Sequence, residues 1–147
     1  MDRTPRPALP QPRGQIRRLR LFESRGSVGR CRAFAIEALH DWGWLPAEDA
    51  EGREIAGDVV LLVTELVTNA CLHAGGPREL VLTLAGPAIR VEVSDASPAE
   101  PAIRTGQHPA VPSGHGLKVV DRLAAAWGYA RHEEGKTVWL EVARRAT

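Results

Sequence analysis

The most constraining feature of this chain is one long apolar segment, VVLLVTELVTNACLHAGG, in which polar residues recur at every fourth position. These polar residues are Glu65, Asn69 and His73. A helix advances about 100° per residue, so residues four apart lie within about 40° of one another and share one stripe of its surface. We therefore expect a helix over about residues 53–74, with its valines in the core and a polar stripe lining a ligand pocket. The leucines that border this stripe are Leu61, Leu62 and Leu72.

The overall composition indicates one folded domain. The chain has 147 residues, 44% of them hydrophobic, which is enough for a single core. The formal net charge of +1 gives no reason to expect binding to nucleic acid or to an anionic membrane. No uninterrupted apolar run reaches the roughly 20 residues of a membrane span, and no signal-peptide pattern opens the chain. Cys31 and Cys71 lie in apolar helical patterns without a C-x-x-C, so we expect a reduced, cytoplasmic protein with two buried thiols.

The first 15 residues differ from the rest of the chain. They contain four prolines and three arginines without an apolar pattern, which predicts a disordered basic tail. Residues 16–147 form the expected single domain.

The remaining pattern predicts separate helices and strands joined by hairpins, which favours an α+β two-layer sandwich over a parallel βαβ fold. Ser27 is expected to cap the first helix. Gly75-Gly76-Pro77 is a strong terminator for the second. The expected elements are an edge strand at 16–22, a helix at 27–42, a helix at 53–74, strands at 79–85 and 89–95, a long loop at 96–113, a helix from 114 to 124, and strands at 127–131 and 137–142.

The polar stripe suits a magnesium–phosphate site. Mg²⁺ prefers oxygen ligands and commonly takes one or two from the protein together with substrate phosphates. The Asn69 amide oxygen can be such a ligand, and Glu65, one turn earlier, can accept a proton from an attacking hydroxyl or water. The plain alternatives are a solvated stripe and, for His73, a structural hydrogen bond at the end of the helix.

Asp95 ends a strand and opens the long loop. A carboxylate in that position can accept a hydrogen bond from an exocyclic amine such as that of adenine. The alternative is an aspartate that starts a turn by bonding its own backbone. A structureless loop as long as 96–113 is usually functional or mobile in a compact domain.

The segment Gly114-His115-Gly116-Leu117 opens the helix after this loop. Glycines allow backbone N–H groups to approach phosphates, and a helix N-terminus adds partial positive charge. The segment lacks the third glycine of the dinucleotide fingerprint, which excludes that motif. The chain also has no P-loop, paired zinc spacing or G-x-S-x-G motif. Gly135-Lys136-Thr137 starts the final strand and is equally typical of a plain hairpin turn.

The order of these motifs is more specific than any one of them. The pattern E-L-V-T-N-A-x-x-H-A, a strand ending in Asp, a long loop, G-x-G-L-x-V-V-D and G-K-T-V-W resembles the GHKL ATPase superfamily. It is most similar to the bacterial anti-sigma factor serine/threonine kinases, over about residues 16–142.

The resemblance implies an ATP site between a helical layer and a mixed, mostly antiparallel sheet with helices on one face. ATP and Mg²⁺ would be the cofactors, and the 96–113 loop would be a lid over the phosphates. By this resemblance Asn69 would be the magnesium ligand and Glu65 the general base. Asp95 would recognise adenine, with Thr137 beside it. Gly114, His115, Gly116 and Leu117 would close over the phosphates.

The resemblance also implies partners. These are an anti-anti-sigma protein of the STAS type as the phosphorylation substrate, a sigma factor, and a second copy of the chain in a homodimer. One departure stands out: the superfamily carries D-x-G-x-G after the second strand, whereas this chain has Asp95-Ala96-Ser97-Pro98-Ala99. The missing glycines favour the alternative of a non-catalytic nucleotide-binding module, whereas the presence of Glu65 favours an enzyme.

Overall fold

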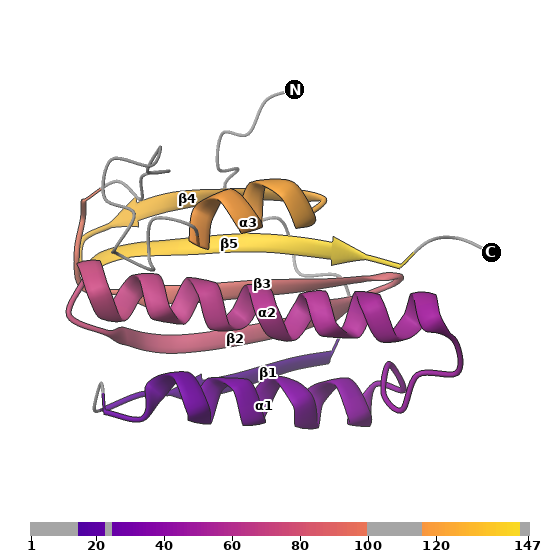
Figure 1. The fold of residues 1–147 in the computed structure, drawn as a ribbon. Coiled ribbons are helices and arrows are strands. Elements are labelled where there is room, and N and C mark those ends of the chain that lie inside the picture. Colours follow the sequence, from indigo (N-terminus) through magenta and orange to yellow (C-terminus); the bar gives the residue numbers. More distant parts are fainter. Residues whose placement is uncertain (1–14, 23–24, 100–115, 145–147) are drawn as a thin grey trace.

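The computed structural model describes residues 15–22, 25–99 and 116–144 (Figure 1). The order of elements expected from the sequence is confirmed. The elements are β1 (Gln15–Arg20), α1 (Ser27–Asp41), α2 (Ala50–His73), β2 (Pro77–Ala85), β3 (Ala88–Asp95), α3 (Gly116–Leu123), β4 (Ala126–His132) and β5 (Gly135–Ala143). The proline-rich tail and residues 100–115, which include most of the expected lid, lie outside the described residues.

The strands form one sheet in the order β1-β2-β3-β5-β4, and the helices cover one face of it (Figure 1). This confirms the α+β two-layer architecture and the edge position of β1. All four strand pairings in the described part of the chain are antiparallel, so the sheet there is not mixed as the resemblance implied. Gly86 lies between β2 and β3 with a φ of 61°, as the predicted hairpin requires.

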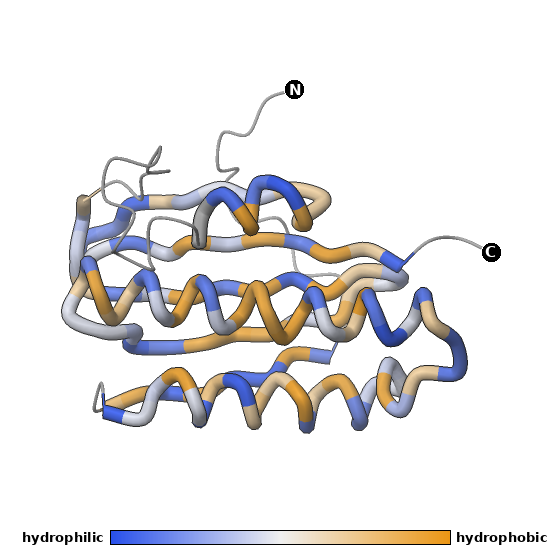
Figure 2. Tube along the Cα trace, in the orientation of Figure 1, coloured by the Kyte–Doolittle hydropathy of each residue, from blue (hydrophilic) through white to orange (hydrophobic). Residues whose placement is uncertain are grey.

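The core lies between the sheet and the helices. Strand residues alternate between the two faces, and Figure 2 shows this alternation of hydropathy along the strands. The inward-facing apolar side chains of β2, β3 and β5 pack against the apolar side of α2, which is the helix between α1 and α3. The largest fully buried side chains are Leu39, Leu62, Leu80, Leu82, Ile89, Leu140, Val59, Val63, Val67, Val91 and Val93.

Helix α2 begins three residues earlier than the apolar pattern predicts. The reason is Asp49, whose side chain accepts a hydrogen bond of 2.7 Å from the N–H of Gly52 and thereby caps the helix. In α1 the expected cap is wrong. The cap position belongs to Gly26, in the left-handed conformation, and Ser27 is the first helical residue and is buried.

The leucines beside the polar stripe do not form a wall around it. Leu62 is in the core, whereas Leu61 and Leu72 are 41% and 52% exposed. Glu65 and Asn69 are half-buried, so the stripe lies at the border between the core and the solvent face. By length and composition α2 could cross a membrane, since an 18-residue stretch of it has a mean hydropathy of 1.7. The central helix of a two-layer domain has the same properties when its apolar side packs on a sheet, as it does here.

Candidate nucleotide-binding site

The predicted site residues of α2 and β3 come together at one end of the sheet. Asp95, the last residue of β3, pairs with Pro77 at the start of β2 and with Lys136 at the start of β5. Helix α2 ends just before β2, so its C-terminal half lies at this end. Figure 1 shows the N-terminal end of α3 on the same side. Strands β2 and β5 therefore flank Asp95, and α2 and α3 each have one end at the same end of the sheet.

Asp95 lies on the face of the sheet that the helices cover and is 2% exposed. Its Oδ1 atom accepts the N–H of Ser97 at 2.9 Å and the ammonium group of Lys136 at 3.0 Å. The first bond is the turn-forming alternative considered from the sequence, and it is present. Within the described part of the chain no hydrogen bond is made to Oδ2. The second oxygen is therefore left to accept a bond from a ligand amine.

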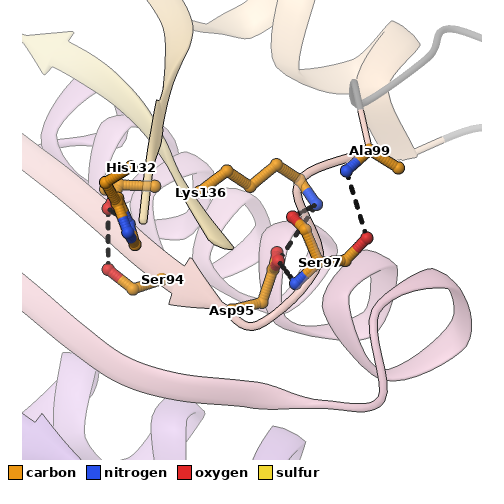
Figure 3. Close-up of polar contacts among 7 residues, drawn as sticks. Ser94, Asp95, Ser97, Ala99, His132 and Lys136 are labelled. Atoms are coloured by element: carbon orange, nitrogen blue, oxygen red, sulfur yellow. Dashed lines mark hydrogen bonds and ion pairs between the residues drawn. The ribbon is translucent and has the colours of Figure 1, made fainter. Parts of the chain in front are cut away.

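Lys136, for which the sequence left a plain hairpin turn and a site role equally open, contacts Asp95 directly. Its Nζ atom bonds Asp95 Oδ1 and also donates to the backbone carbonyl of Ser97 at 3.1 Å (Figure 3). Both charged side chains are almost fully buried, so each compensates the charge of the other. The signal in the sequence was the period-two pattern of β5, which places Lys136 on the same face as Val138 and the other core residues.

The Thr137 side chain, predicted to lie beside Asp95, points away from it. Because neighbouring residues of a strand point to opposite faces, the Thr137 side chain lies on the face of the sheet away from Asp95 and the helices. There its hydroxyl contacts the Ser94 hydroxyl at 2.8 Å and the Nε2 atom of His132 at 3.2 Å. Only the backbone of Thr137 runs near the aspartate.

The backbone after Asp95 turns without the glycines of the superfamily motif. The Asp95–Ser97 bond makes one tight turn, and Ser97 Oγ accepts the N–H of Ala99 at 3.2 Å in the next. No non-glycine residue in the described ranges has a positive φ, so these turns need no glycine. The glycine is on the neighbouring strand instead. Gly135, with φ of 146°, has its Cα against the carbonyl of Asp95.

The side of α2 that carries Glu65 and Asn69 faces α3. Asp58, two turns before Glu65 on the same side, lines a cavity together with Leu123 of α3. Burial raises the pKa of the Asp58 carboxyl, and Glu54 adds to this shift. The Asn69 amide makes no hydrogen bond within the described residues, so its oxygen is available as a ligand. His73, in contrast, is exposed.

The described residues fit a purine nucleotide with a magnesium ion. A buried carboxylate with one open oxygen suits the base, and the uncommitted Asn69 amide suits the metal. The described residues contain no group of three or more His, Cys, Asp and Glu side chains that could hold a metal alone. Helix α3 begins at Gly116 and continues with Leu117; Gly114 and His115 lie outside the described residues.

The comparisons with known proteins agree with this geometry. No curated protein matches the chain significantly. The family model of the histidine kinase-like ATPase domain matches residues 24–142. This span contains α1, α2 and α3 together with the Asp95 end of the sheet, and such domains bind ATP, usually with Mg²⁺. The chain therefore belongs to the family of histidine kinase-like ATPase domains.

Proposed function

We propose that this protein is an anti-sigma regulatory factor that transfers the γ-phosphoryl group of ATP to a serine or threonine of an anti-anti-sigma partner of the STAS type. The observation that carries the proposal is the placement of Glu65 one turn before Asn69, both half-buried on the side of α2 that faces α3. A protein that only binds nucleotide needs a metal ligand, whereas a transferase also needs a group that takes the proton of the attacking hydroxyl.

Each residue has one task in this reaction. The free oxygen of Asp95 accepts a hydrogen bond from the adenine amine and fixes the base. Asn69 holds the magnesium ion, which neutralises phosphate charge when ATP is bound. The oxygen of the serine or threonine hydroxyl attacks the γ-phosphorus in line with the departing ADP. Glu65 takes the proton of that hydroxyl. Phosphoryl transfer depends mainly on such positioning and charge neutralisation.

The regulatory consequence follows from the state of the partner. The unphosphorylated partner would bind this protein and displace a sigma factor from it. The phosphorylated partner would dissociate from this protein. Such a role places the protein in the cytoplasm, with the sigma factor and the STAS protein as its partners. It needs no direct contact with nucleic acid and no membrane.

The test is a transfer assay with γ-labelled ATP, Mg²⁺ and purified STAS-type proteins. We expect the wild-type protein to label a serine or threonine of one partner, and Asn69→Ala to abolish labelling while the circular dichroism spectrum is unchanged. Thr68→Ala, which changes the solvent side of the same helical turn, is the control and should retain labelling. An Asn69→Ala protein that labels its partner at the normal rate would contradict the assignment.

A second candidate is a regulatory module that binds nucleotide and transfers nothing. It is favoured by the sequence after Asp95, where turns formed by side chains replace the glycines of the superfamily motif. Calorimetry of ATP binding with and without Mg²⁺, run beside the transfer assay, separates the two. Saturable binding without transfer to any STAS partner supports the module.

A further inference from the structure

The proposed transfer reaction gives no role to the positive charge buried beside Asp95. The chain has two lysines against seventeen arginines, and one of these lysines, Lys136, is 4% exposed. Lysine is among the residues least often buried, and burial of its charge requires a close partner. The position of this ammonium group therefore needs an explanation beyond chain packing.

The bonds around Asp95 divide its two oxygens. Oδ1 accepts from the Lys136 ammonium group and from the Ser97 N–H, while Lys136 also holds the Ser97 carbonyl. Figure 3 shows these three residues joined in one cluster. A carboxylate held at Oδ1 by two donors from different segments cannot rotate freely. Its orientation, and the place of Oδ2, are fixed before any ligand arrives.

We propose that Lys136 is a positioning residue for base recognition, which holds Asp95 so that Oδ2 alone is presented to the 6-amino group of a purine. The inference rests on the nucleotide binding in the proposed function and adds the source of its base selectivity. A buried carboxylate in a fixed position favours a purine with an amine at position 6, which can donate to Oδ2. When this amine is missing, Oδ2 is left as an unpaired buried acceptor. Guanine would place its 6-oxygen against the carboxylate, which is unfavourable.

A purely structural role for Lys136 makes a different prediction. If the ion pair only stabilised this end of the sheet, its loss would weaken the binding of two nucleoside triphosphates that differ only in the base by the same factor. If Lys136 orients Asp95, its loss must weaken the nucleotide that carries the 6-amino group more than the one without it. The ratio of the two affinities distinguishes these roles.

The experiment compares ATP with purine riboside triphosphate, which is ATP without the 6-amino group, by calorimetry in the presence of Mg²⁺. We expect the wild-type protein to prefer ATP by about tenfold or more, as for a hydrogen bond to a charged group. In Lys136→Met we expect this preference to fall to about threefold or less. Lys118→Met removes the other lysine, which is exposed on α3, and should leave the ratio unchanged.

The outcomes separate this inference from the proposed function. A wild-type protein that binds neither nucleotide would overturn both. ATP binding with the same preference in the wild-type and Lys136→Met proteins would overturn only the role of Lys136. If Lys136→Met does not fold, Lys136→Ala takes its place, because the smaller side chain admits water beside Asp95. The same fall in the ratio is expected, and an unchanged ratio refutes the proposal.

Discussion

Gly135 passes so close to Asp95 that a β-carbon at position 135 would overlap the Asp95 carbonyl oxygen. The obstacle is backbone, which cannot move aside as a flexible side chain can. The φ of Gly135 is also 146°, a conformation that other residues rarely adopt. The start of β5 can therefore lie against Asp95 only because position 135 has no side chain.

Gly135→Ala is expected to destabilise the protein by about 3 kcal/mol, the sum of backbone strain and overpacking. The measurement is urea denaturation followed by circular dichroism. Gly86→Ala is the matched control, since it also has a positive φ but has no atom within 4 Å of the added carbon. It should lose only about 1 kcal/mol. Equal losses in the two variants would show that contact with Asp95 does not matter.

Thr137→Val tests which residue of β5 belongs to the site. The Thr137 hydroxyl bonds Ser94 and His132 on the far face of the sheet, so its removal should change ATP affinity by less than about twofold. Stability should fall by about 1 kcal/mol through the lost hydrogen bonds. Asp95→Asn, measured beside it by calorimetry, should weaken ATP binding by about tenfold or more. A Thr137→Val protein as weak as Asp95→Asn would restore the role inferred from sequence resemblance.

Glu65→Gln should separate binding from transfer. The amide keeps the size of the side chain but cannot take a proton, so the transfer rate should fall by about 10²-fold or more while ATP affinity stays nearly constant. Single-turnover labelling of the STAS partner measures the rate, and calorimetry measures the affinity. Glu54→Gln makes the same change near the other end of α2 and should leave the rate unaffected. Normal transfer by Glu65→Gln would exclude Glu65 as the base.

The thiol of Cys31 should make stability depend on pH in the alkaline range. Burial raises the pKa of Cys31 to about 11, from the 9.0 of a free thiol. The folded state thus favours the neutral thiol, and the resulting stability is complete below about pH 9 and is lost as the pH rises towards 11. By pH 10 the loss should be about 1 kcal/mol.

Urea denaturation of the wild-type protein and of Cys31→Ala at pH 7.5 and 10 measures this contribution. Other groups titrate equally in both proteins, so the change in their stability difference reports Cys31. The difference should shrink at the higher pH. Cys71, which is half-buried with a pKa raised by burial, remains in both proteins. A constant difference would mean that Cys31 ionises equally in the folded and unfolded chains.

The sequence predicted local structure well where one periodicity dominates. The four-residue spacing of Glu65, Asn69 and His73 was enough for a helix with a polar stripe, and the strand expected at 89–95 is present as β3 and ends at Asp95. Its errors came from competing local interactions. The Asp49 side chain extended α2, and Gly26 took the cap position expected for Ser27.

The order of elements, the two-layer architecture and the polar stripe on α2 could all be predicted from the sequence, because they follow from hydrophobic periodicity and turn residues within short segments. The partner of Asp95, in contrast, depends on how the strands pair in three dimensions. The register between β3 and β5 sets Lys136, and not Thr137, opposite the aspartate. A shift of one residue would exchange them, and that register depends on packing between strands 41 residues apart in sequence, which no local pattern records.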